Sequence, residues 1–458
     1  MKLSPPVPEI SDANPYGKDL FGRKQFGDSL TSLFTNIEEG VVLCIDAPWG
    51  DGKSTFAKMW SAELRLQGKH CIYFDAFEHD YTDDPFVAFC AEIIQLTSKE
   101  FEGKQAIQSL KEGFKVKATR VAAKVLTTGA RLGAKLATLG LLKDEDFKAV
   151  AAIKDDIADS SSRAFSALVE KALENYTLGK SQIDDFREQL SELATAIRKE
   201  QGFPLLIIVD ELDRCRPDFA IALIERMKHL FSTENVSFVL MANVRQLENS
   251  VKAIYGSEID ARNYLQKFFT LTVDLPKDRR GEHTNDFSKY CHRLVQHYLS
   301  TGGSHAPWQE LTPILTSLFQ RYDFSLREME RSISYLALYL ARYRPGRVFE
   351  VGMIAMLVAM RVRFRDVMEA LGADRLSFDQ LLEKLAISLS TNDDNASHSV
   401  ERATRAFKYL LMANEAYKGL GENNPMRRLL ETWEFHNNLE RHRVLPDVCA
   451  DFTQFRIE

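Results

Sequence analysis

The sequence predicts an α/β fold, in which a parallel-sheet core carries a large helical insertion and is followed by an all-helical C-terminal domain. Five short segments have the length of strands, and the third is apolar throughout, as expected of a parallel strand buried on both faces. The last three follow one another at the spacing of strand–helix–strand units. In chain order the expected strands are Val41–Ile45, Cys71–Phe74, Leu205–Val209, Phe238–Ala242 and Phe269–Val273.

A long gap separates the second expected strand from the third. A crossover between parallel strands needs only a dozen or more residues, so roughly a hundred of the residues between Cys71 and Leu205 must form an insertion. The segment Phe86–Lys199 has the pattern of helices, with few Gly or Pro breaks in its second half. We therefore expect a first domain over residues 1–275, with a helical insertion at about residues 90–200.

The C-terminal helical domain is expected over residues 276–458. A polar stretch, Lys277–His283, has the composition of a linker, and the chain beyond it has the periodicity of helices. Val351–Met360 is apolar but too short to span a bilayer, so it predicts a buried core helix.

The first strand leads into a phosphate-binding pattern. Residues Ala47–Thr55 read Ala-Pro-Trp-Gly-Asp-Gly-Lys-Ser-Thr, and a helix is expected directly afterwards at Phe56–Trp60. A strand, a glycine-containing turn and a helix in this order form the context in which the pattern binds phosphate. Gly50 and Gly52 allow backbone N–H groups to point into one nest for phosphate oxygens, and the helix N-terminus adds partial positive charge.

Two side chains of this loop have separate expected tasks. Lys53 can reach the β- and γ-phosphates of a nucleotide, and the Ser54 hydroxyl can ligate Mg²⁺. The alternative is an ordinary strand–turn–helix that matches a short pattern by chance. The residues expected to contact the nucleotide are Pro48, Trp49, Gly50, Asp51, Gly52, Lys53, Ser54 and Thr55.

The third strand ends in a group of acids, where ligands bind in open α/β sheets. Asp210 is expected to hold Mg²⁺ through water, and Glu211 to polarise the attacking water as a general base. Asp213 competes for the role of base, and an N-cap or a salt bridge to Arg214 or Arg216 is an equally good interpretation of it. Combined with the phosphate-binding loop, these acids predict a site for a nucleoside triphosphate and Mg²⁺.

The two motifs together resemble the KAP family of P-loop NTPases. The loop Pro-Trp-Gly-Asp-Gly-Lys-Ser and the acidic motif Asp-Glu-Leu-Asp-Arg-Cys carry the resemblance, which extends from about Asp19 to Arg331. It implies a P-loop NTPase core and the ASCE type of ATPase, in a soluble member of the bacterial type. No Asn-Lys-x-Asp guanine signature occurs in the sequence, which favours ATP as the nucleotide.

The resemblance also implies roles for residues outside the two motifs. It places Gly22 and Arg23 near the adenine and Asn243 at the sensor-1 position, and it makes Arg327 the sensor-2 residue that contacts the nucleotide of its own chain. Related ring-forming ATPases deliver a positive charge to the neighbouring subunit from the helix before the fifth strand, where this chain has Arg262 and Lys267. The structural alternative for these two is an ordinary surface salt bridge.

The family resemblance implies a switch or motor component, often in antiphage defence, that works as a homo-oligomer or with a partner effector protein. A nucleotide-gated scaffold with little turnover is the competing interpretation, and tight binding without turnover would identify it. A translocase stimulated by nucleic acid is the third, and DNA- or RNA-dependent turnover would identify that.

Composition restricts the partners and the compartment. With 59 basic and 65 acidic residues the net charge is -6, which gives the chain no bulk attraction to nucleic acid. Six cysteines occur without a Cys-x-x-C pair, and Cys44 and Cys71 lie in expected core strands. Both observations favour a reduced, cytoplasmic chain. The N-terminal residues 1–14 lack an apolar signal core. We expect no metal beyond the Mg²⁺ that accompanies the nucleotide.

The insertion contains a basic segment, residues 115–143, that holds no acidic residue. Many KAP relatives insert transmembrane helices at this location, but here Lys124, Arg131 and Lys135 interrupt the apolar run and argue against spanning. Three interpretations are open. The segment is a helix packed on the domain with a solvated basic edge, a helix on an anionic membrane surface at the inner face, or a contact for nucleic acid or protein.

Overall fold

The computed structural model describes most of residues 9–454. Outside the description lie residues 38, 70, 82–84, 86–88, 90–186, 229, 232, 279–284, 300–307, 342–349, 388–395 and 438–439. The chain divides into two compact units. The sheet unit comprises Glu9–Pro48 and Gly52–Pro276, and the helical unit comprises Trp49–Asp51 and the chain from Lys277 onward.

The sheet unit is built on five strands in the order β2-β3-β4-β1-β5. All neighbouring strands are parallel. β3 and β4 are buried along their whole length, which explains why their sequences are continuously apolar. The strands are β1 (Val42–Asp46), β2 (Cys71–Asp75), β3 (Leu205–Asp210), β4 (Val236–Ala242) and β5 (Leu271–Asp274). All five expected strands are confirmed, with small shifts at their ends.

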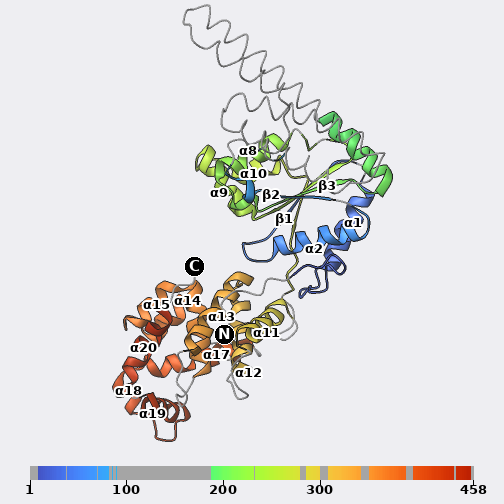
Figure 1. Ribbon diagram of the computed structural model, residues 1–458. Helices are drawn as coiled ribbons and strands as arrows, with labels where there is room; N and C mark the ends of the chain where they lie inside the picture. The colour runs from blue at the N-terminus through green and yellow to red at the C-terminus, as the bar shows by residue number, and fades with distance from the viewer. Residues whose placement is uncertain are drawn as a thin grey trace, which may run out of the picture. The chain divides into compact units, whose positions relative to one another are not determined.

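Helices cover both faces of this sheet (Figure 1). Successive strand residues point to opposite faces, so Leu43 and Ile45 of β1 pack with α1 and α2, whereas Val42 and Cys44 pack in the cluster that includes α8 and α9. The helical elements of the sheet unit are α1 (Lys24–Asn36), α2 (Lys53–Leu66), η1 (Phe77–His79), a helix over 187–201, η4 (Leu212–Arg214), α8 (Pro217–Met227), α9 (Val244–Tyr255) and α10 (Ala261–Gln266). The sheet thus has a two-sided core.

The helical unit contains only helices among its described residues. They are α11 (Asp286–Leu299), α12 (Trp308–Arg321), α13 (Leu326–Ala341), α14 (Val351–Arg363), α15 (Arg365–Gly372), α16 (Phe378–Lys384), α17 (Ala396–Leu410), α18 (Asn414–Lys418), α19 (Pro425–Asn437) and α20 (Arg441–Thr453). α14 is buried from Gly352 to Arg361 and packs against α12, α13 and α17. This confirms the expected core helix at Val351–Met360.

The expected insertion lies largely outside the described residues. Only the helix over 187–201 belongs to its described part, and the basic segment 115–143 falls entirely within the undescribed range. In the portion of the chain that is described, no helix has the length and apolar character needed to cross a membrane.

Candidate functional site

The phosphate-binding loop joins β1 to α2. β1 ends at Asp46 and α2 begins at Lys53. Between them Gly50 and Gly52 have φ angles of 87° and 83°, in the left-handed region that other residues rarely adopt. Gly52 is also the N-cap residue of α2. The loop therefore turns directly into a helix N-terminus, where free backbone N–H groups and the helix dipole favour an anion.

Lys53 lies inside the loop. Its side chain is only 8% exposed, and its Nζ donates to the carbonyl oxygens of Ala47 at 2.6 Å and Pro48 at 3.3 Å. Burial lowers the pKa of Lys53, while the carboxylate of Asp213 acts in the opposite direction. The loop backbone thus surrounds one buried amine, at the position where a bound phosphate needs a cation.

Asp213 forms its ion pair with Lys53, and the Oδ2–Nζ distance is 3.8 Å. The sequence predicted an N-cap or a salt bridge to Arg214 or Arg216, but not this partner. Asp213 lies within η4, so it is not the N-cap of that helix, and the N-cap of α8 is Arg216. Arg214 pairs with Glu211 at 2.8 Å, and Arg216 pairs with Asp80 at 3.1 Å. The sequence could not show that the loop lysine and this acid meet in space.

Asp210 ends β3 and is completely buried. Its Oδ1 accepts a hydrogen bond from the backbone N–H of Glu211 at 2.8 Å, and its Oδ2 accepts one from the Tyr73 hydroxyl at 2.6 Å. Burial raises the pKa of Asp210, and the hydrogen bond from Tyr73 opposes that rise. Both carboxylate oxygens are therefore fixed by donors of the chain.

Glu211 links the acidic motif to the phosphate-binding loop. Its Oε1 accepts a hydrogen bond from the Ser54 hydroxyl at 3.1 Å and pairs with the Arg214 guanidinium at 2.8 Å. Its φ is 59°, and such left-handed backbone in a non-glycine residue is uncommon and concentrates at functional sites. Burial raises the pKa of Glu211, and Arg214 opposes this effect. Two motifs that lie far apart in the sequence thus meet at one edge of the sheet.

The family model for the KAP family P-loop domain matches residues 23–343. The chain belongs to the KAP family of P-loop NTPases. The resemblance read from the two motifs is therefore confirmed, together with the α/β class built on a P-loop core and helical parts.

No curated protein sequence matches this KAP chain. Among solved structures, it is similar to the Aeropyrum pernix ORC2 protein, whose structure was solved in ADPNP and ADP complexes. The TM-score is 0.34 and the sequence identity is 11%, over 94% of this chain and 95% of that one. A likeness of this size carries no argument about fold or function.

Asn243 follows β4 and is the N-cap residue of α9. In the KAP sheet β4 lies between β1 and β3, so Asn243 follows the strand that separates the two motif-bearing strands. Asp46, at the end of β1, accepts a hydrogen bond from the backbone N–H of Val244 at 3.0 Å. The start of α9 is thereby tied to the strand that precedes the phosphate-binding loop.

Gly22 and Arg23 precede α1, and Gly22 has a φ of 67°. The Arg23 guanidinium is buried and donates to the carbonyl oxygens of Gly52 at 3.4 Å and Pro276 at 3.3 Å. It also lies 4.9 Å from the centre of the Phe21 ring. The structure therefore brings Arg23 to the backbone of the phosphate-binding loop, and its expected position near an adenine stays a prediction.

Within the helical unit, Arg327 of α13 lies against the loop residues that group with that unit. A Cβ added to Gly50 would lie 2.5 Å from the Cβ of Arg327. Asp51 accepts a hydrogen bond from the Leu326 N–H at 3.3 Å and pairs with Lys277 at 3.4 Å. Trp49, in the same short segment, is 42% exposed. The close approach at Gly50 explains why a residue without a side chain stands there.

Arg262 and Lys267 are exposed at α10 and just beyond it. The Nζ of Lys267 lies 5.7 Å from the centre of the Tyr264 ring. An exposed position is what a contact with a second subunit requires. The contact with a neighbouring chain stays a prediction.

Three contacts of this site were not predicted from the sequence: Tyr73 with Asp210, Lys53 with Asp213, and Asp46 with the start of α9. Asp46 could have been found, because it stands at the carboxyl end of a strand as Asp210 does. The other two depend on which strands are neighbours, which the sequence does not state. Thr55, the last residue of the pattern, lies in the first turn of α2.

The oxygen ligands of this site suit Mg²⁺, which accompanies the nucleotide. Ser54 and Asp210 offer the oxygen atoms that Mg²⁺ prefers. Among the described residues, no cluster of three or more His, Cys, Asp or Glu side chains could hold a metal ion by itself. The protein part of such a site is small, as expected where phosphates supply further ligands.

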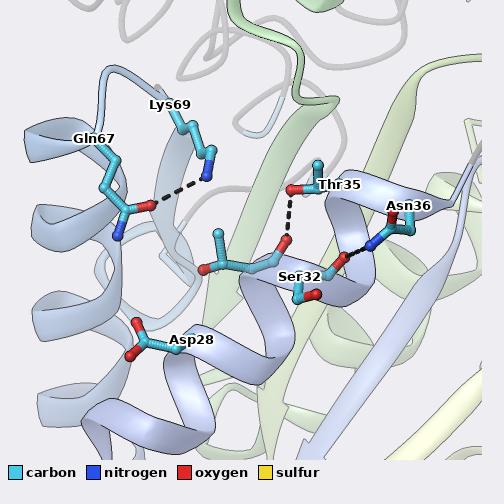
Figure 2. Close-up of a pocket in the computed structure, with 7 residues that line it drawn as sticks. Asp28, Ser32, Thr35, Asn36, Gln67 and Lys69 are labelled. Carbon is cyan, nitrogen blue, oxygen red and sulfur yellow. Dashed lines mark hydrogen bonds between the residues drawn. The ribbon is translucent and has the colours of Figure 1, made fainter.

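A separate pocket of about 330 Å³ lies at the other end of α2 (Figure 2). It is lined by Asp28, Thr31, Ser32, Thr35, Asn36, Gln67 and Lys69. Lys69 donates to Gln67, and Thr35 donates to the backbone of α1, so its lining groups bond partly to one another. α2 spans 14 residues, which places this pocket roughly 20 Å from the start of that helix. It does not belong to the phosphate-binding loop.

Proposed function

We propose that this KAP protein binds ATP with Mg²⁺ and hydrolyses it, as a switch or motor component. The observation that carries the proposal is the 3.1 Å hydrogen bond between Ser54 and Glu211. It brings the metal-binding hydroxyl of the loop and the acid after Asp210 to one place. Membership of the KAP family supports nucleotide binding independently of this geometry.

ATP binding is assigned to the loop backbone and Lys53. The glycine conformations aim backbone N–H groups at the phosphates, and the N-terminus of α2 adds its dipole. Lys53 already lies among the loop carbonyls at 2.6–3.3 Å, so only its terminal amine needs to turn toward a β- or γ-phosphate. Burial lowers the pKa of Lys53, and a bound phosphate would add a second stabilising anion to the Asp213 carboxylate beside it.

The metal role is assigned to Ser54 and Asp210. When bound, Mg²⁺ neutralises the charge that develops on the phosphate oxygens. The Ser54 hydroxyl would ligate it, and the Asp210 carboxylate would orient its water ligands. Since Asp210 is fully buried and held at both oxygens, it presents a rigid acceptor rather than a mobile one.

Glu211 is the proposed general base. Its carboxylate lies at the site edge with a raised pKa, which suits a group that accepts a proton from water. Asp213 is a poorer choice for the same role, because its side chain is 1% exposed and paired with Lys53. The contact of Glu211 with Ser54 must break when Ser54 turns to the metal, and its ion pair with Arg214 must loosen before Glu211 can act as the base.

The contacts that hold the Glu211 carboxylate favour a second function, a nucleotide-gated scaffold with little turnover. As long as Ser54 and Arg214 hold the Glu211 carboxylate, ATP can bind without being hydrolysed. Two measurements on the same protein separate the two functions: the affinity for ATP with Mg²⁺, and the multiple-turnover rate. Tight binding with negligible turnover identifies the scaffold, and steady turnover identifies the ATPase. A role in antiphage defence with a partner effector rests on the family resemblance alone.

Assembly into a homo-oligomer is expected to raise turnover. A positive charge delivered from a neighbouring chain to the γ-phosphate can be worth roughly 10³–10⁵ in rate, and Arg262 and Lys267 are our candidates for it. Activity per chain should therefore rise with protein concentration. Mixing inactive Lys53→Ala with a double variant, Arg262→Ala with Lys267→Ala, should restore part of the activity, because mixed interfaces pair an intact loop with an intact donor. Constant activity per chain down to a monomeric dilution contradicts this prediction.

The cytoplasmic location and the contact with an inner membrane face are also proposals. The latter rests on residues 115–143, which lie outside the described residues. Changing Lys124, Arg131 and Lys135 together to glutamate is expected to abolish co-sedimentation with anionic liposomes and to leave basal ATP turnover unchanged, because charge attracts the segment to anionic lipid. If the wild-type protein does not bind such liposomes at low salt, the membrane contact is excluded.

A further inference from the structure

A tyrosine of β2 reaches the acid at the tip of β3. The Tyr73 hydroxyl donates to Asp210 Oδ2 at 2.6 Å. The Tyr73 ring is partly buried against the core cluster that α1 and α2 form with the sheet, and the Nζ of Lys58 lies 5.7 Å from the ring centre. Packing thus holds the ring, and the hydroxyl is aimed at the carboxylate.

Strand register makes this contact depend on the length of a tyrosine. Tyr73 is opposite Ile208, and Asp75 is opposite Asp210. The backbone of Tyr73 therefore lies two residues behind that of Asp210, which is about 6.6 Å along the strand. A phenol can cover that distance, whereas the hydroxyl of a serine or threonine at the same position cannot.

Three groups of the chain orient the Asp210 carboxylate. It is completely buried, its Oδ1 accepts the N–H of Glu211, and its Oδ2 accepts the Tyr73 hydroxyl. The Ser54 hydroxyl also hydrogen-bonds to this carboxylate, but it is the group expected to turn to the metal. Each carboxylate oxygen has two acceptor positions, so these bonds leave capacity for the water molecules of a metal ion. Without the hydroxyl of Tyr73, the Oδ2 atom would lose this 2.6 Å hydrogen bond in a buried position, which is costly.

On the basis of the proposed function, we propose that Tyr73 is a positioning residue for the metal. Its hydroxyl fixes the Asp210 carboxylate in the orientation that holds the water ligands of nucleotide-bound Mg²⁺. Tyr73 belongs to neither motif. Groups that orient a metal-binding side chain from the second layer typically contribute 10–100-fold to metal affinity or activity, and a loss of about 10-fold or more is therefore expected here.

The variant Tyr73→Phe removes the hydroxyl and keeps the ring. Affinity for a fluorescent ATP analogue is measured by titration in EDTA and again over a series of Mg²⁺ concentrations. The Mg²⁺ concentration that gives half of the maximal gain in affinity should rise by about 10-fold or more. Affinity in EDTA should stay within about twofold of wild type, because the phosphate-binding loop is untouched. This split separates a metal-positioning role from general damage to the site.

Two further variants sharpen the test. The control, Tyr255→Phe, also removes a tyrosine hydroxyl that donates to a carboxylate, here that of Glu225 on the α8–α9 side of the sheet unit. The Mg²⁺ response of this variant should equal that of wild type. Asp210→Asn should weaken the Mg²⁺ response more than Tyr73→Phe does. The double variant, Tyr73→Phe with Asp210→Asn, should lose no more than Asp210→Asn alone, since the hydroxyl acts through that carboxylate.

The outcomes are distinct. An unchanged Mg²⁺ response in Tyr73→Phe overturns the role of Tyr73 while leaving the proposed ATPase intact, and so does an equal loss of affinity in EDTA. Additive losses in the double variant also overturn it. Wild-type protein that binds the ATP analogue in neither condition overturns the proposed function and the role of Tyr73 together. Wild-type protein that binds but does not turn over still decides the role of Tyr73, because the readout is binding.

Discussion

Replacing Lys53 with alanine is expected to abolish measurable ATP turnover. Lys53 is a buried amine inside the loop, within 3.3 Å of two loop carbonyls. Removing one preorganised donor to developing phosphate charge typically costs roughly 10²–10³ in rate. Steady-state phosphate release with saturating ATP and Mg²⁺ measures the effect. Turnover close to that of wild type would contradict the assignment of the loop.

The same variant should also lose stability, because it removes one partner of the buried ion pair between Lys53 and Asp213. Breaking a buried ion pair by removing one partner costs about 3–5 kcal/mol, and the pair here has exposures of 8% and 1%. The control is the double variant Lys53→Ala with Asp213→Asn, which should recover most of the free energy of unfolding but none of the turnover. Denaturant titration of both variants separates a lost site from a damaged fold.

Replacing Glu211 with glutamine is expected to keep ATP binding and to lose on the order of 10²–10⁴ in rate, the usual contribution of a general base. Glutamine has the shape of glutamate and can still accept from Ser54, whose hydroxyl lies 3.1 Å from Oε1. The variant should therefore trap ATP. Single-turnover hydrolysis and filter binding of ATP measure the two effects on one sample.

Asp213→Asn is the matched comparison for that experiment. It also replaces an acid of the same motif with an amide, but at a side chain that is paired with Lys53. A mild effect of Glu211→Gln beside a large effect of Asp213→Asn would transfer the role of base to Asp213.

The strands and both motifs could be read from the sequence because their physical causes are local. A strand buried on both faces must be apolar throughout, so the run that ends at Asp210 was visible. A loop that needs left-handed backbone shows glycine, as Gly50 and Gly52 do. The apolar stretch within α14 was identifiable for the same reason, since burial on all sides removes helical periodicity.

Contacts between neighbouring strands could not be read in this way. Tyr73 meets Asp210 only because β2 lies beside β3 in one particular register. Lys53 meets Asp213 because the sheet brings the start of α2 close to η4. Neither pair has a sequence spacing that signals it. The grouping of Trp49–Asp51 with the helical unit likewise depends on tertiary contacts, such as that of Asp51 with Lys277.

The strand order has a consequence for how the chain folds during synthesis. β1 lies between β4 and β5, so Leu43 pairs with Val239 on one side and Leu271 on the other. Both neighbours emerge from the ribosome long after β1, and at roughly 5–20 residues per second this delay is on the order of ten seconds or more. During that time β1 has two unpaired apolar edges, which are templates for aggregation. A nascent chain that stalls before β5 is therefore expected to need a chaperone. The helical unit, whose described residues form only helices, should fold quickly once it is made.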